Sequence, residues 1–129
     1  MTAAVICTVL LTTLVFGLGM NVSRVRSRST NQMPTQLDDP LFVAIRAHAN
    51  ATEYVPALAI LMLLVGSQEP GTWAIALFVA ATAARYLHAI GVLTAGDMGQ
   101  RSVGRHVGAI GTDVFGFALG VAAVLAYTT

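Results

Sequence analysis

Four long apolar stretches constrain the fold of this chain more than any other feature of its sequence. They cover residues 2–20, 41–66, 72–93 and 106–127 of the 129 residues. A helix needs about 20 residues to cross a bilayer core about 30 Å thick. The stretches are too long and too continuous for strands, and an open sheet cannot face lipid. We therefore predict an all-α membrane protein, a four-transmembrane-helix bundle that forms a single domain over residues 1–129.

The composition also indicates that the chain lies in a lipid membrane. The chain is 56% hydrophobic and only 10% charged, whereas soluble domains carry about 25% charged residues. Its net charge of +1 provides no basic surface for nucleic acid. One cysteine excludes an internal disulfide, and three separated histidines predict no metal site. These properties exclude a soluble enzyme, a disordered chain and a nucleic-acid binder, and the sequence contains no phosphate loop and no dinucleotide fingerprint.

The first stretch has a second interpretation as a cleaved signal peptide. It lacks a basic segment at its start, however, and the cluster Arg24, Arg26 and Arg28 follows the apolar run instead of preceding it. A transmembrane helix is therefore the favoured interpretation of residues 2–20.

The arginines are distributed unevenly between the two sides of the predicted bundle. Five of the seven lie in segments 21–40 and 94–105, which an even number of spans places on one side. The positive-inside rule assigns that side to the cytoplasm and both termini to the outside. When the charges inside the spans are included, Glu69 alone belongs to the opposite leaflet. We therefore expect the functional site in the cytoplasmic leaflet.

The second stretch opens with the polar segment RAHANATEYVP, residues 46–56. Helical spacing places Arg46, Asn50 and Glu53 on one face and His48 roughly opposite. Charged groups at this depth normally face a bundle interior or a wet cavity. An ion pair between Arg46 and Glu53 that only locks helices together would explain them. Because arginines outnumber acids in this leaflet, an anionic ligand is a further interpretation.

The third and fourth stretches carry a second polar group. In ARYLHAIGVL, Arg85 and His88 lie one helical turn apart, and in RSVGRHVGAIGT, Arg101 and Arg105 flank the entry to the last stretch. The structural interpretation of His88 is an interhelical hydrogen bond. For Arg101 and Arg105 it is snorkelling toward the membrane surface. Haem ligation by His88 and His106 has no supporting motif. Glycines spaced for close helix packing occupy positions 104, 108, 116 and 120.

These segments together resemble a known family. RAHANATEYVP resembles the signature of the MAPEG family, the membrane-associated proteins of eicosanoid and glutathione metabolism, and ARYLHAIGVL and SVGRHVGAIGT resemble its bacterial members. The resemblance covers about residues 40–112. It implies a homotrimer of four-helix subunits in a bacterial inner membrane, surrounded by lipid. It also implies glutathione as the co-substrate, bound between neighbouring subunits, and a lipophilic second substrate that enters from the bilayer.

The resemblance also assigns roles to individual residues. The glutathione-binding positions are Arg24, Arg46, Asn50, Glu53, Arg85 and His88. The thiolate-stabilising arginine is either Arg105, as in the bacterial and leukotriene-synthase-like pattern, or Arg101 followed by Ser102, as in the prostaglandin-E-synthase-like pattern; Arg105 is preferred. The chain departs from the family where a tyrosine often found near His88 is replaced by Val92.

The implied chemistry is physically reasonable. Guanidinium groups pair with the carboxylates of glutathione, Glu53 suits its ammonium group, and a guanidinium near the sulfur favours the nucleophilic thiolate. We therefore predict a membrane-bound glutathione transferase of detoxification, with glutathione peroxidase activity as a further option. The alternatives are a non-catalytic lipid-binding accessory protein of the same family and a small four-span proton-coupled transporter that uses Glu53.

Overall fold

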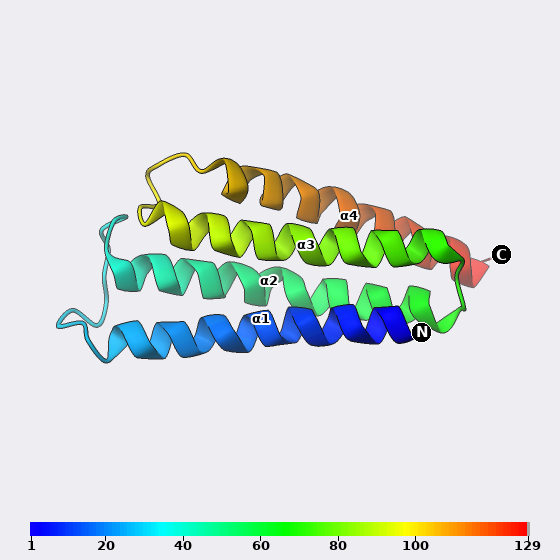
Figure 1. The fold of residues 1–129 in the computed structure, drawn as a ribbon, viewed down its shortest axis with the longest axis horizontal. Helices are drawn as coiled ribbons and strands as arrows, with labels where there is room; N and C mark the ends of the chain where they lie inside the picture. The colour runs from blue at the N-terminus through cyan, green and yellow to red at the C-terminus, as the bar shows by residue number, and fades with distance from the viewer. Residues whose placement is uncertain (129) are drawn as a thin grey trace.

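Each of the four apolar stretches forms one helix in the computed structural model, which describes residues 1–128 (Figure 1). The helices are α1 (Thr2–Arg26), α2 (Pro40–Ser67), α3 (Thr72–Ala95) and α4 (Val103–Thr128). The shortest, α3, has 24 residues and spans about 36 Å, enough to cross a bilayer core. All four are apolar enough for that environment. The predicted all-α bundle of four membrane helices is therefore confirmed.

The helices begin and end where local chemistry dictates. Asp39 precedes α2, and its Oδ1 atom accepts hydrogen bonds from the backbone N–H groups of Leu41 (2.8 Å) and Phe42 (3.4 Å). Pro40, which lacks an N–H group, occupies the first helical position, where none is required. At the end of α3, Gly96 adopts the left-handed conformation with φ of 66°, which terminates the helix.

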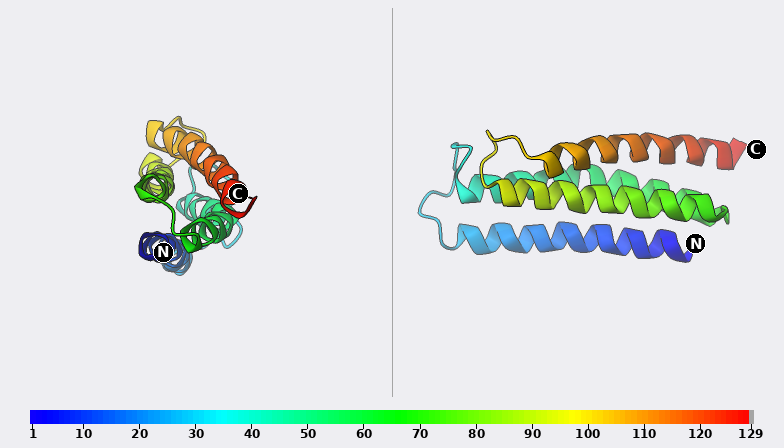
Figure 2. Two further views of the ribbon diagram at one scale, coloured as in Figure 1. Left: turned by 90° about the vertical axis from the view of Figure 1, so that its right-hand side faces the viewer. Right: turned by 45° about the horizontal axis from the view of Figure 1, so that its top comes forward.

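The helices run alternately up and down (Figure 1). α2 and α3 form the centre of the bundle, and α1 and α4 flank it (Figure 1, Figure 2). α1 packs chiefly on α2, and α4 chiefly on α3; within residues 1–128, α1 and α4 do not touch each other. The two termini lie at one end. The connections 27–39 and 96–102 lie at the other end, which we call the loop end, and the N–H group of Met98 donates to the carbonyl of Leu37 (2.8 Å) between them.

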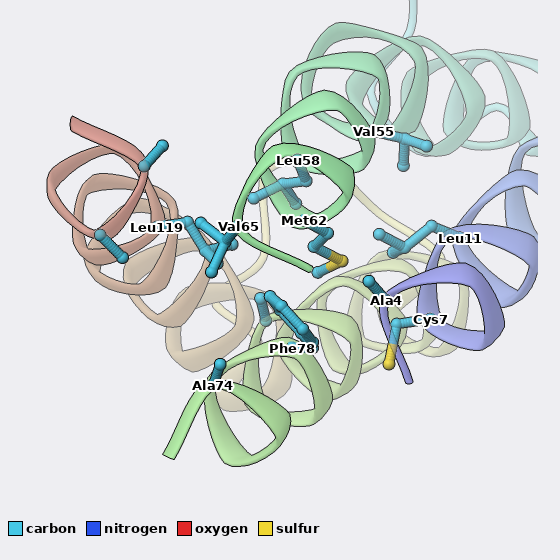
Figure 3. Packing of buried hydrophobic residues seen from close by; sticks show 13 residues of the cluster. Ala4, Cys7, Leu11, Val55, Leu58, Met62, Val65, Ala74, Phe78 and Leu119 are labelled. Atoms are coloured by element: carbon cyan, nitrogen blue, oxygen red, sulfur yellow. The ribbon is translucent and has the colours of Figure 1, made fainter. Parts of the chain in front are cut away.

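The buried core differs between the two ends of the bundle. Toward the termini, all four helices contribute apolar side chains to one cluster, including Leu11, Met62, Phe78 and Leu119 (Figure 3). Toward the loop end, a smaller cluster draws on α1, α2 and α3 and contains no residue of α4. Polar side chains, among them Asn50, Arg85 and Thr112, instead lie between α4 and α2 there. The fold therefore leaves room for a polar site at the loop end.

Close backbone packing joins α3 to α4 near that site. A Cβ atom added to Gly91 would collide with the backbone of Gly104 and Arg105, and one added to Gly108 would collide with the backbone of His88. The predicted packing role holds for Gly104 and Gly108. It does not hold for Gly120, which has open space around it. Gly91, the partner on α3, was not predicted.

This packing generates a stability prediction. Replacement of Gly91 with alanine forces α3 and α4 apart, so we expect Gly91→Ala to lower the free energy of unfolding by about 1–3 kcal/mol. Gly17 is the matched control because a Cβ atom there meets nothing within 4 Å; Gly17→Ala should leave stability unchanged or raise it by up to about 1 kcal/mol. Unfolding of both variants in mixed micelles provides the measurement. Equal stability of the two variants would contradict the packing described.

Candidate functional site

A cavity of about 300 Å³ opens at the loop end between α2, α3, α4 and the 96–102 connection. Its polar wall brings together Arg46 and Asn50 from α2, His88 from α3 and Arg105 from α4. These four residues come from three separate stretches of the sequence. The remaining lining residues are Val92, Met98, His106 and Ala109. The cavity therefore combines two guanidinium groups, an amide and two imidazoles within one small volume.

Arg105 projects from the first turns of α4 and is half-buried. Its Nη1 atom donates to the backbone carbonyl of Met98 (3.1 Å) and lies 3.9 Å from the sulfur of Met98. Within residues 1–128, the other N–H groups of this guanidinium have no partner. One side of the group is therefore fixed by the 96–102 connection, and the other can bind an anion.

His88 is held in place by the same residue. Its Nδ1 atom lies 2.9 Å from the backbone carbonyl oxygen of Arg105. A carbonyl oxygen can only accept a hydrogen bond, so Nδ1 must carry the hydrogen. The close packing of Gly108 against the backbone of His88 brings the two groups within reach. His88 is only 7% exposed, yet it lines the cavity.

Arg85 lies one turn before His88 but is directed into the bundle and is 1% exposed. Its Nη2 atom donates to Asn50 Oδ1 (2.7 Å), and its Nη1 atom donates to Thr112 Oγ1 (3.3 Å). The hydroxyl of Thr112 donates in turn to the carbonyl of Gly108 (2.7 Å). The guanidinium thus connects α2, α3 and α4 in one hydrogen-bonded chain.

This chain determines what Asn50 presents to the cavity. Its amide oxygen accepts from Arg85, so its Nδ2 group is free to donate. The ring of Tyr54 covers Arg85 on another side, with the guanidinium carbon 5.0 Å from the ring centroid. Arg85 itself does not line the cavity. It orients Asn50 through their hydrogen bond, and its predicted place beside the ligand remains a prediction.

Four other predicted residues lie outside this cavity. Arg24, at the end of α1, is exposed and borders a separate groove of about 520 Å³ beside the start of α2. Glu53 is exposed on α2, and Arg101 is exposed before α4. Ser102 accepts a hydrogen bond from the backbone N–H of Arg105 (3.4 Å) and thereby caps α4. Within one chain, the structure therefore divides the predicted residues into two sets.

The simpler interpretation of the polar face of α2 is not supported. No ion pair joins Arg46 to Glu53 within residues 1–128, and both side chains are exposed. His48 lies on the other side of α2, as helical spacing predicts, where its Nε2 atom would be 3.3 Å from a Cβ atom on Gly19 of α1. Arg46 and Glu53 are therefore free to bind something other than each other.

Three contributors to the site were missed by sequence reasoning. Met98 fixes Arg105, whereas Thr112 and Tyr54 both contact Arg85. None of the three carries a sequence signal that separates it from ordinary helix or loop residues. The helical spacing of Arg105, Gly108 and Thr112 is the only available indication, because it places them on one face of α4.

His88 and His106 each use Nδ1 for a backbone carbonyl, and no group of three potential metal ligands occurs within residues 1–128.

A second, larger and mostly apolar groove of about 620 Å³ runs along α2 and α4. Tyr54 and Thr112, which contact Arg85, form part of its wall, and Leu58, Phe117 and Val121 form its apolar surface. Asp113 lines the same groove and is exposed. Apolar and ionisable groups therefore share one outward face of the bundle.

The fold and this polar site define an integral membrane protein of four helices with cationic and polar side chains gathered at the loop end. The sequence profile of the MAPEG family matches residues 4–126. The chain therefore belongs to the MAPEG family, whose members are membrane proteins of eicosanoid and glutathione metabolism. No curated protein and no solved structure gives a significant match to the chain.

The buried hydrogen bond between Arg85 and Asn50 generates the second prediction. A hydrogen bond to a charged group contributes about 1.5–3 kcal/mol, whereas neutral interhelical hydrogen bonds in membranes average about 0.6 kcal/mol. In a double-mutant cycle with Arg85→Met and Asn50→Leu, we expect a coupling energy of about 1.5 kcal/mol or more. Unfolding in mixed micelles measures the four free energies.

A distant pair provides the control for this cycle. Asn50→Leu combined with Gly17→Ala should give additive changes, because Gly17 faces open space on α1. Additive changes for Arg85→Met with Asn50→Leu as well would show that the hydrogen bond does not stabilise the bundle.

Proposed function

We propose that this protein is a membrane-bound glutathione transferase in which Arg105 stabilises the glutathione thiolate. The observation that supports this most is the convergence of Arg46, Asn50, His88 and Arg105 on one cavity of about 300 Å³. Glutathione carries two carboxylates, an ammonium group and a thiol. Two arginines with free N–H groups, together with an amide donor, match the carboxylates and the peptide groups.

Arg105 is the preferred thiolate-stabilising residue over Arg101. Its guanidinium is half-buried, fixed on one side by the carbonyl of Met98 and open toward the cavity on the other. A fixed cation in a partly desolvated site stabilises a developing anion more than a mobile one in water does. Arg101 is exposed and lies outside the cavity. The thiolate then attacks an electrophilic carbon, and the leaving group departs with the electron pair.

The second half of the glutathione site is proposed to come from a neighbouring copy in a homotrimer. Glu53 and Asp113 are exposed on a surface that faces lipid in a single chain, and charged groups at membrane depth are costly there. A second copy against this face would cover them. It would also allow Glu53 and Arg24, which lie outside the cavity of their own chain, to reach a glutathione bound by the next.

The lipophilic substrate is proposed to reach the sulfur from the bilayer. Hydrophobic electrophiles and hydroperoxides concentrate in lipid, and the exposed surface of the bundle is largely apolar. We place the loop end in the cytoplasmic leaflet of the inner membrane, because the arginine-rich connections lie there. Cytoplasmic glutathione and a membrane-dissolved substrate would then meet at one site.

A non-catalytic lipid-binding accessory is the second candidate. The apolar groove of about 620 Å³ along α2 and α4 favours it, since that volume suits a lipid chain. This role does not explain why Arg46, Asn50, His88 and Arg105 converge on the smaller cavity. The transferase is therefore the preferred proposal.

The choice of arginine generates the third prediction. Purified protein should conjugate glutathione to an aryl halide, and Arg105→Ala should lower kcat/KM by about 10- to 1,000-fold. Arg101→Ala is the matched control and should change kcat/KM by less than about threefold. A larger loss in Arg101→Ala than in Arg105→Ala would transfer the role to Arg101. Failure of the wild-type protein to bind glutathione would refute the transferase itself.

The shared site generates the fourth prediction. Arg105→Ala and Glu53→Gln chains, each expected to have reduced activity alone, are co-expressed in equal amounts so that they mix within trimers. If the two residues act from different copies, about one quarter of the sites contain both native side chains, and activity returns in that proportion. If they act within the same copy, each site carries a defect and no activity returns. Native mass spectrometry verifies that mixed trimers form.

A further inference from the structure

The Nε2 atom of the His88 imidazole has no structural role in the bundle. Nδ1 donates to the carbonyl of Arg105, so in the neutral ring Nε2 carries a lone pair. Within residues 1–128, Nε2 has no hydrogen-bond partner. The buried polar atoms that lack a partner do not include Nε2. Because Nε2 has no partner and is not one of these buried atoms, solvent reaches it. Since His88 is 7% exposed and lines the cavity, this nitrogen is accessible from within the cavity.

We propose that His88 is the general base that accepts the thiol proton of glutathione through Nε2. The inference rests on the proposed function, because it names the proton acceptor of that same reaction. Arg105 can stabilise a thiolate but cannot take up a proton, since its guanidinium is always protonated. The thiol proton must therefore go to a group other than Arg105, and the cavity supplies imidazole nitrogen as an acceptor.

The proton transfer balances within the site. The S–H bond breaks, its electron pair stays on sulfur as the thiolate, and the proton forms an N–H bond at Nε2 to give imidazolium. The net charge of the site is unchanged by this step. The thiolate then forms a bond to the electrophilic carbon and displaces halide, which leaves with its electron pair. The imidazolium returns its proton to water and restores the neutral ring.

The other groups around His88 are consistent with this assignment. The charged and titratable neighbours are Arg85 on the same helix, Arg105 and His106 on α4, and Arg46 across the cavity on α2. Three of these are arginines and cannot accept a proton. His106 also lines the cavity, but it is exposed at the start of α4, and its Nδ1 lies 2.8 Å from the carbonyl oxygen of Ser102. His88 is the buried imidazole, fixed in one tautomer between Arg105 and the cavity.

Two substitutions separate a base from a purely structural histidine. His88→Asn keeps a donor near the position of Nδ1 for the carbonyl of Arg105 but provides no group that can take up a proton. His88→Gln keeps a polar group near the position of Nε2. In stopped-flow absorbance, we expect His88→Asn to slow thiolate formation by about 100-fold or more, while the Kd for glutathione changes less than about threefold. His88→Gln should slow it equally. Added imidazole should restore the rate in proportion to its concentration.

The matched control is His48→Asn, because His48 lies on the far side of α2 against Gly19. It should form the thiolate at the wild-type rate. A wild-type rate in His88→Asn would overturn the proposal and leave the transferase intact. A larger loss in His106→Asn than in His88→Asn would also overturn it. If the wild-type protein binds no glutathione, the proposed function itself fails.

One readout needs no variant of His88. With an internal base, thiolate formation by the wild-type protein should not accelerate as the concentration of an external buffer base is raised. A rate that increases linearly with buffer concentration would show that the proton leaves directly to solvent, and it would overturn the proposal even if both His88 variants fail to fold.

Discussion

A desolvated guanidinium in the bundle is the constraint on which the loop end of this protein depends. Arg85 is 1% exposed, and an ionised group buried without partners costs several kcal/mol. α2 and α4 must therefore hold oxygen atoms close to it, which they do with Asn50 and Thr112. Among residues 1–128, no apolar cluster reaches α4 at this end. The position of α4 is consequently set there by hydrogen bonds and by close glycine packing against α3.

The same interactions prepare the cavity for a ligand. Three polar groups in its wall have one side fixed by the protein and one side free: Asn50 is held by Arg85, His88 by the carbonyl of Arg105, and Arg105 by the carbonyl of Met98. Such fixed groups need little reorganisation when charge develops on a bound molecule. The apolar core lies toward the termini, on the other side of the bundle from these groups (Figure 3). The large apolar core and the proposed chemistry are thus located at opposite ends of one bundle.

The fold could be predicted from the sequence because the length of an apolar run and the bilayer thickness determine the number of helices. The set Arg46, Asn50, His88 and Arg105 was also predicted, from the cost of charge at depth and from the family resemblance. The different roles of Arg85 and His88 could not be predicted. They lie one turn apart, and only the packing of α3 on α4 at Gly91 and Gly108 decides which of them enters the cavity. The contribution of Met98 depends on the path of a connection, which no local pattern encodes. Glu53 and Arg24 remain predictions, because a partner surface would determine their role.

The central claim is that the cavity among α2, α3 and α4 binds glutathione with its sulfur beside Arg105. A structure of the detergent-solubilised protein determined at saturating glutathione tests this most directly. We expect tripeptide density against Asn50 and Arg105, with the sulfur within about 4 Å of the guanidinium. Density elsewhere on the bundle, or an empty cavity at saturating glutathione, would contradict the claim.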